Sequence, residues 1–255
     1  MDNVSFKKIL FLTLPMLFAV ALAITLAACM AQANRTVDDS ILPGGTTAPP
    51  SGTGGGQQVI APVSSLEFKS NGDGTCSLSG IGSCTDRAVA VPEYSPEGDR
   101  VTSVADSAFL GNSTFTQISL PKSVKYIGAY AFYSSSLESI TLHSDIESIG
   151  ECAFANCTAL TSITVDNANR KYSSLDGVLF SKDKSELICY PSGKQNTSYT
   201  IRSSVKKIHN MAFYNCAALK TVNYNGTKDE WDQIKIGANN DSLTSAEIKF
   251  PSSNK

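Results

Sequence analysis

Apolar side chains recur along this chain in one pattern that is repeated four times. Each copy has two branched apolar residues three positions apart, then an Ala-Phe pair, and then apolar residues in alternation. The first two intervals between successive Ala-Phe pairs are 23 and 22 residues, and the pairs lie at Ala108-Phe109, Ala131-Phe132, Ala153-Phe154 and Ala212-Phe213. A fixed apolar period of this length is typical of a solenoid, in which one short unit stacks on the next.

Each repeat predicts two short strands and a bend. The stretch 137–142 predicts a strand with Ile140 and Leu142 facing inward, and Val124 with Ile127 predicts a second strand on the opposite wall. The Ala-Phe pair predicts a bend that directs its ring into the core, so stacking should produce a column of Phe rings. Burying roughly seven apolar side chains does not offset the entropy of ordering about 22 residues, so we expect the stack to be the folding unit.

The third interval between Ala-Phe pairs is 59 residues and therefore holds additional structure. Two apolar runs, 176–180 and 187–191, flank the polar stretch 181–184 and predict a hairpin. We expect a variant coil carrying this hairpin at about 166–201, after which Ile201 rejoins the register of an ordinary coil.

The two ends of the repeat region predict caps, because a bare terminal coil would expose its core. Residues 65–100 contain alternating stretches around Asn71-Gly72-Asp73-Gly74, which predict a hairpin within an N-terminal β cap. The solenoid then occupies 101–224. Residues 225–255 predict a C-terminal cap, in which Thr227 and Glu230 form a capping box and Trp231 covers the last coil.

The repeat at 146–165 resembles the BspA-type leucine-rich repeat, and the variant coil and the segment 226–231 resemble parts of the same family. The resemblance implies a mainly β leucine-rich-repeat solenoid of BspA type, with about five coils of short parallel strands and a cap at each end. Gly128 and Gly150 follow the family pattern, whereas Asp106 and Asn210 replace that glycine in the other repeats. The resemblance also implies a role in attachment, but no ligand-contacting residue can be carried over.

The N-terminal segment 1–28 predicts a lipoprotein signal peptide. Lys7 and Lys8 precede an apolar stretch that ends in Leu26-Ala27-Ala28-Cys29, which resembles the lipobox of bacterial lipoproteins and implies lipidation of Cys29. An ordinary secretory signal and an uncleaved anchor remain alternatives. Residues 29–64 are rich in Gly, Pro, Ser and Thr and predict a flexible tether. We therefore expect an exported protein, lipid-anchored to the bacterial outer membrane or cell surface.

Composition argues against nucleic-acid binding and catalysis. The net charge is −2 and only 17% of residues are charged, so we expect no nucleic-acid partner. Lys and Arg are scattered, and no basic patch can be read from the sequence. The chain has two histidines and lacks a nucleophile elbow and a phosphate-binding glycine loop. We therefore expect no enzymatic activity, no cofactor and no metal site.

Two pairs among the seven cysteines are candidates for a disulfide, and Cys152 with Cys157 is the weaker of them. Cys76 and Cys84 flank a short β segment, and in an exported protein a bond between them is chemically allowed. Cys157 and Cys216 share one repeat position and are expected in the core, too far apart to pair.

The outward positions of the alternating strands predict a flat, uncharged face that could bind a partner. This candidate face consists of Gln117, Ser119, Ser139, Thr141, Ser162, Thr164, Thr221 and Asn223. The same residues also suit a solvated sheet with no ligand, and a rim with Lys125, Tyr126, Tyr133, Lys206 and Lys207 is an alternative contact zone.

These features together predict a monomeric surface protein that mediates adhesion or protein–protein interaction. Its expected ligand is a host matrix protein or another surface protein, with a glycan as a further option. The alternative function is a structural or accessory component of the cell envelope with no host ligand.

Overall fold

The computed structural model describes residues 65–251. All of these residues belong to one compact unit. The predicted signal peptide 1–28, the lipidation at Cys29 and the tether 29–64 lie outside the described residues.

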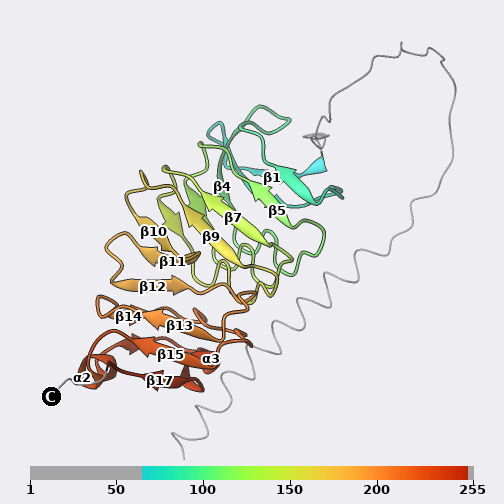
Figure 1. The fold of residues 1–255 in the computed structure, drawn as a ribbon. Coiled ribbons are helices and arrows are strands. Elements are labelled where there is room, and N and C mark those ends of the chain that lie inside the picture. The colour runs from blue at the N-terminus through green and yellow to red at the C-terminus, as the bar shows by residue number, and fades with distance from the viewer. Residues whose placement is uncertain (1–64, 252–255) are drawn as a thin grey trace, which may run out of the picture. The chain divides into compact units, whose positions relative to one another are not determined.

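The N-terminal half of the described chain forms two walls of stacked strands (Figure 1). One wall is a sheet in the order β1-β2-β4-β6-β8 and the other is a sheet in the order β3-β5-β7-β9. The first contains β1 (Glu67–Ser70), β2 (Thr75–Gly80), β4 (Arg100–Val104), β6 (Tyr126–Ile127) and β8 (Ser148–Ile149), and the second contains β3 (Ala88–Ala90), β5 (Gln117–Ser119), β7 (Ser139–Leu142) and β9 (Ser162–Val165). All neighbours are parallel except β1 and β2, which form the predicted antiparallel hairpin.

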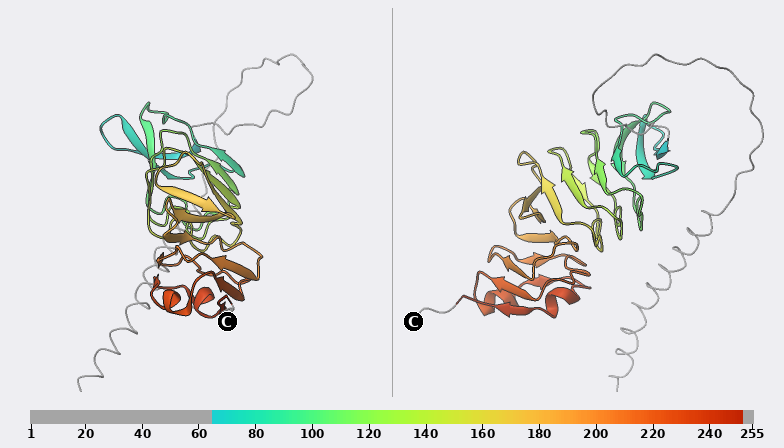
Figure 2. Two further views of the ribbon diagram at one scale, coloured as in Figure 1. Left: turned by 60° about the vertical axis from the view of Figure 1, so that its left-hand side comes forward. Right: turned by 45° about the vertical axis from the view of Figure 1, so that its right-hand side comes forward.

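The C-terminal half repeats this arrangement with two further sheets (Figure 2). One has the order β10-β11-β12-β14-β16 and the other β13-β15-β17. The strands are β10 (Tyr172–Leu175), β11 (Val178–Ser181), β12 (Glu186–Cys189), β13 (Ser198–Ile201), β14 (Lys207–Ile208), β15 (Thr221–Tyr224), β16 (Lys235–Ile236) and β17 (Glu247–Lys249). The predicted hairpin forms between β11 and β12, and β10 adds a third antiparallel strand to it.

The described chain contains seven coils rather than the expected five. Each coil gives one strand to each wall, in the pairs β2/β3, β4/β5, β6/β7, β8/β9, β12/β13, β14/β15 and β16/β17. The difference arises at the ends, where β2 pairs in parallel with β4 and β17 pairs in parallel with β15. These end segments lack an Ala-Phe pair, but their alternating apolar residues still extend the ladders.

The predicted column of aromatic rings is present in the core. Phe132 stacks on Phe109 and on Phe154 at centroid distances of 5.3 and 5.4 Å, with nearly parallel planes. In the C-terminal half Phe213 stacks on Tyr190 at 5.1 Å, so Tyr190 supplies the ring of the variant coil. Ile140 and Leu142 are buried as expected, and so are Val124 and Ile127 on the opposite side.

The bends at the Ala-Phe pairs are tight because residues on both sides of each ring adopt the left-handed conformation. The residue two positions before Phe and the residue two positions after it have positive φ, as at Tyr130 (55°) and Ser134 (59°) or Cys152 (55°) and Asn156 (60°). Asn is among the residues that tolerate this conformation best, whereas Tyr and Cys adopt it at a cost. Packing of the adjacent ring must therefore hold these corners.

The C-terminal coil is completed by two short helices. α2 (Lys228–Asp232) begins with the predicted capping box, in which Thr227 accepts from the backbone of Glu230 and the Glu230 side chain accepts from the backbone of Thr227. Trp231 packs edge-on against Tyr224 at 5.3 Å. α3 (Asp241–Thr244) follows, and its Leu243 is fully buried. Within 65–251, no helix combines the length and apolarity that a membrane crossing requires.

Both ladders are interrupted at the variant coil. β8 and β9 end the N-terminal sheets, and β12 and β13 belong to the C-terminal ones. The core divides at the same place into two clusters of buried side chains. Leu179 of β11 belongs to the N-terminal cluster, whereas Val178 and Phe180 belong to the C-terminal one. β11 therefore connects the two cores through its two faces.

Candidate binding surfaces

Six of the eight residues of the predicted binding face lie together on the β3-β5-β7-β9 sheet. Gln117, Ser119, Ser139, Thr141 and Thr164 are exposed and Ser162 is half-buried. β3, β5 and β7 form a shallow depression of about 630 Å³ on this surface, to which no Asp, Glu, Lys or Arg contributes. We call this surface the polar face.

Thr221 and Asn223 do not join the polar face, because they lie on β15 in a separate sheet. The β10-β11 hairpin separates the two surfaces. The backbone N–H of Ile163 donates to the carbonyl of Gly177, and the N–H of Val165 donates to the Ser174 hydroxyl, so the hairpin lies along the outer side of β9. The eight residues therefore do not form one continuous surface, and ligand binding by any of them remains a prediction.

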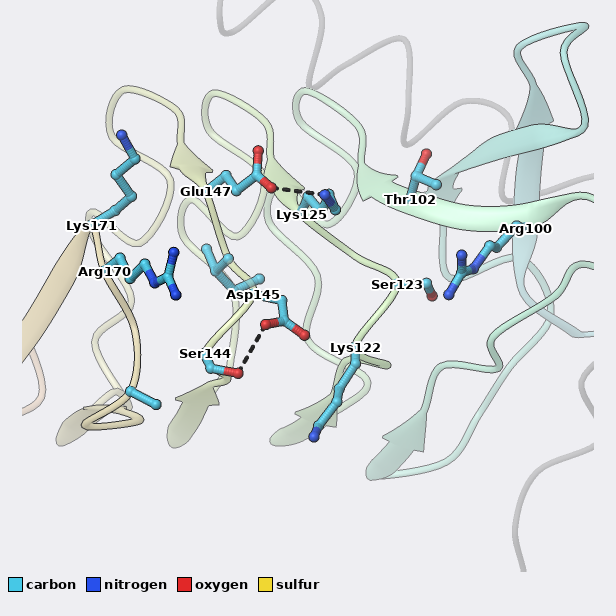
Figure 3. Close-up of a pocket in the computed structure, with 12 residues that line it drawn as sticks. Arg100, Thr102, Lys122, Ser123, Lys125, Ser144, Asp145, Glu147, Arg170 and Lys171 are labelled. Atoms are coloured by element: carbon cyan, nitrogen blue, oxygen red, sulfur yellow. Dashed lines mark hydrogen bonds and ion pairs between the residues drawn. The ribbon is translucent and has the colours of Figure 1, made fainter.

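A second depression, of about 780 Å³, lies along the loops that lead into the β4-β6-β8 wall (Figure 3). Five basic side chains line it, namely Arg100, Lys122, Lys125, Arg170 and Lys171, together with the acidic Asp145 and Glu147. No basic patch could be read from the sequence, because these cations are far apart along the chain and only stacking brings them together. We call this depression the basic groove.

Two of the five cations are already paired. Lys125 Nζ lies 2.8 Å from Glu147 Oε1, and Arg100 lies 2.9 Å from Glu93. The hydrogen bond between Lys125 and Glu147 raises the pKa of the lysine and lowers the pKa of the carboxyl. Lys122, Arg170 and Lys171 are exposed and form no ion pair with another residue of the described range.

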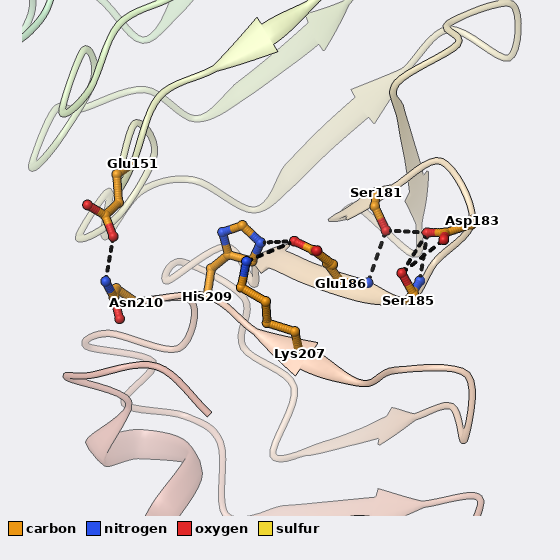
Figure 4. Close-up of polar contacts among 8 residues, drawn as sticks. All are labelled: Glu151, Ser181, Asp183, Ser185, Glu186, Lys207, His209 and Asn210. Carbon is orange, nitrogen blue, oxygen red and sulfur yellow. Dashed lines mark hydrogen bonds and ion pairs between the residues drawn. The ribbon is translucent and has the colours of Figure 1, made fainter. Parts of the chain in front are cut away.

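A third depression, of about 510 Å³, marks the corner of the variant coil. Leu187 pairs with Ile208, and Tyr190 aligns with Phe213. In the variant coil Leu187 and Tyr190 are three positions apart, whereas Ile208 and Phe213 in the next coil are five positions apart. The variant coil therefore lacks two corner residues. The neighbouring coils bridge the space, since Asn210 donates to Glu151 (Figure 4). Asn215 also donates to Asn156, at 3.1 Å.

Polar groups at this corner form structural contacts rather than a catalytic arrangement. His209 Nε2 lies 2.5 Å from Glu186 Oε2, and Lys207 lies 3.2 Å from the same atom. The hydrogen bond to His209 is the main cause that lowers the pKa of Glu186. Burial raises the pKa of the Cys152 thiol to about 11, which keeps it protonated and unreactive near neutral pH. No three metal-ligating side chains converge in the described part of the chain.

The structure does not join Cys76 and Cys84. Both are buried free thiols, and the Cys76 thiol donates to the carbonyl of Asp99 at 3.6 Å. Cys157 and Cys216 are buried in different core clusters, as expected from their shared repeat position.

Comparison with known proteins agrees with the repeat architecture. The model of the BspA type leucine rich repeat region matches in six copies, over residues 96–193 and 189–255. A search of curated proteins found no significant relative.

Solved structures share the repeat at low overall similarity. A leucine rich cell surface protein from Faecalibacterium prausnitzii is 18% identical, with a TM-score of 0.43 over 80% of this chain and 77% of its own. The T. pallidum leucine rich repeat protein is 21% identical, with a TM-score of 0.45 over 75% and 85%. The pneumococcal vaccine antigen PcpA is 22% identical, with a TM-score of 0.33 over 74% and 68%. Because the family model matches more than half of the sequence, this chain belongs to the BspA-type leucine-rich repeat family.

Proposed function

We propose that this chain is a non-enzymatic binding protein of the bacterial cell surface and that its polar face holds a protein ligand. The observation that carries this proposal is the outer surface of the β3-β5-β7-β9 sheet. Its strands present Ala, Ser, Thr and Gln side chains around an uncharged depression of about 630 Å³. Leucine-rich-repeat surface proteins generally act through such interactions rather than through catalysis.

Two physical arguments support this surface as a contact site. Short side chains such as Ser139 and Thr141 lose little rotamer entropy when a partner covers them. Charged residues are depleted from the centres of protein interfaces, because their desolvation is costly. A partner that covered the polar face would not have to strip water from any carboxylate or ammonium group.

The proposed location follows from the N-terminal segment. Residues 1–28 would direct export, Cys29 would carry the lipid, and 29–64 would hold the repeats away from the outer membrane or cell surface. The repeats would act as a monomer on a host matrix protein or another surface protein. A structural or accessory role in the envelope without a host ligand is the alternative.

Substitutions on the two outward sheets test the polar face. Thr141→Arg places a long charged side chain on the polar face, and Thr200→Arg makes the same change on β13 of the separate sheet. Both positions are exposed, so both variants should fold. In pull-downs of host matrix and envelope extracts with the full-length protein, Thr141→Arg should lose the captured ligand and Thr200→Arg should retain it. Equal capture by both variants would refute the assignment of the face.

Two measurements on intact cells test the location. Added protease should remove the repeat region if it is surface-exposed, whereas protection of the repeats would favour the structural role. Radiolabelled palmitate should enter the wild type but not the Cys29→Ala variant, and equal labelling would refute the lipid anchor.

A further inference from the structure

We propose that the basic groove is a second binding site, for an acidic polysaccharide that carries carboxylate or sulfate groups. This site is separate from the polar face in its residues and in its ligand. The groove lies on the loops between the walls, and its lining residues come from β4 and from the segments that precede β6, β8 and β10 (Figure 3).

The arrangement of the cations suits a chain with repeated negative charges. Lys122 and Lys125 precede β6, whereas Arg170 and Lys171 precede β10 of the variant coil. β4, β6 and β8 are parallel neighbours, at a spacing of about 4.8 Å. The Asn169 side chain donates to the carbonyls of His143 and Ile146, so the segment before β10 lies beside the loop before β8 and continues the row of side chains along the groove. A linear polymer lying along the stack could contact several of these cations at once.

The unpaired cations supply the net attraction. Lys125 forms an ion pair with Glu147, and Arg100 forms one with Glu93. The remaining cations of the groove, Lys122, Arg170 and Lys171, form no ion pair with a carboxylate among residues 65–251. Each of these three side chains is exposed. A polyanion that neutralises them would release its condensed counterions, which favours binding at low salt.

The remaining lining groups favour a sugar over an acidic peptide. Asp145 and Glu147 lie within the groove, and the hydroxyls of Thr102, Ser123 and Ser144 line it. The two carboxylates repel the anionic groups of either ligand, but they accept hydrogen bonds from sugar hydroxyls, which the side chains of an Asp- and Glu-rich peptide do not offer. A polysaccharide carries both hydroxyl donors and anionic groups, so it can satisfy both kinds of lining residue.

The groove also lacks the anchors that protein partners use. Binding hot spots are enriched in Trp and Tyr that fill dry pockets. No aromatic side chain lines this groove, and its one large apolar residue, Ile146, is buried beneath the surface. The contacts on offer are therefore polar and charged.

A triple variant tests the groove. The full-length protein with Lys122→Ser, Arg170→Ser and Lys171→Ser would be compared with wild type for binding to two immobilised acidic polysaccharides. Heparin carries both sulfate and carboxylate groups, and polygalacturonate carries carboxylate groups only. Neutral dextran and poly-L-glutamate serve as the other two ligands. We expect the wild type to bind at least one acidic polysaccharide, with affinity that falls as salt increases, and the triple variant to bind about tenfold or more weakly.

A charge-matched control separates the groove from a general effect of net charge. Lys220→Ser, Lys228→Ser and Lys235→Ser remove three exposed lysines from the C-terminal coils, outside the groove. This control should bind acidic polysaccharide like wild type. The proposal is overturned by an equal loss in the control, by stronger binding of poly-L-glutamate than of either polysaccharide, or by no binding to either. Circular dichroism confirms that each variant is folded.

Discussion

At the scale of single residues, the departures from the family glycine have a structural cause that a single repeat could not reveal. Asp106 Oδ1 accepts from the backbone N–H of Ala129, and Asn210 Oδ1 accepts from that of Ala238, one coil further on in each case. The residue facing each of these side chains is a glycine, Gly128 or Gly237. An acceptor on one coil and a glycine on the next therefore form a pair, whose members are about one repeat apart in sequence.

This pairing predicts that Gly128→Ala destabilises the fold. A Cβ at this position would lie 2.4 Å from the backbone nitrogen of Asp106 and 2.5 Å from its Oδ1, so the coils would have to separate. We expect a loss of about 3 kcal/mol in the free energy of unfolding, measured by urea denaturation. Gly111→Ala is the control, since its φ of 68° adds strain of about 1 kcal/mol but no atom lies within 4 Å of the new Cβ. A larger loss for Gly111→Ala would contradict this interpretation.

At the scale of elements, apolar periodicity predicted the strands and the β11-β12 hairpin, and the spacing of Thr227 and Glu230 predicted the capping box of α2. The expected number of coils was too low, because the segments that form the first and last coils lack the Ala-Phe pair that marks the other repeats. The basic groove was missed for a different reason. Lys125 and Lys171 are 46 residues apart in the sequence, and only the folding of the chain into stacked segments places them in one groove.

The turn between β11 and β12 predicts a pH dependence. Asp183 accepts from the hydroxyls of Ser181 and Ser185 and from the backbone N–H of Ser185, and these hydrogen bonds lower its pKa to about 2. Because the pKa of Asp183 is lower in the folded protein than its ordinary value near 4, the ionised carboxylate stabilises the fold at any pH above about 4. This stabilisation is lost as the pH falls from about 4 towards 2. Wild type should therefore exceed Asp183→Asn in stability at pH 6, and the difference should shrink towards pH 2. Urea denaturation across this range measures it, and a constant difference would contradict the role of the charge.

At the scale of the whole repeat region, the variant coil divides one apparent solenoid into two cores. The sequence marks the place by its long third interval, but β11 reads only as a continuous apolar run. The structure explains that run. All three of Val178, Leu179 and Phe180 are buried, because successive side chains enter different clusters. A strand buried on both faces loses the alternation of a half-exposed strand.

The division predicts that neighbouring substitutions on β11 weaken different halves of the molecule. Leu179→Ala removes a side chain from the N-terminal core, and Phe180→Ala removes one from the C-terminal core. Each should cost about 2–5 kcal/mol locally, because each leaves a cavity. Hydrogen exchange of the full-length protein should show faster exchange in β5, β7 and β9 for Leu179→Ala, and in β13, β15 and β17 for Phe180→Ala.

Ile248→Ala, on β17 at the far end of the C-terminal core, is the control and should accelerate exchange in the same strands as Phe180→Ala. Uniform acceleration in all variants would mean that the bridges at Asn156 and Glu151 couple the two halves into a single cooperative unit.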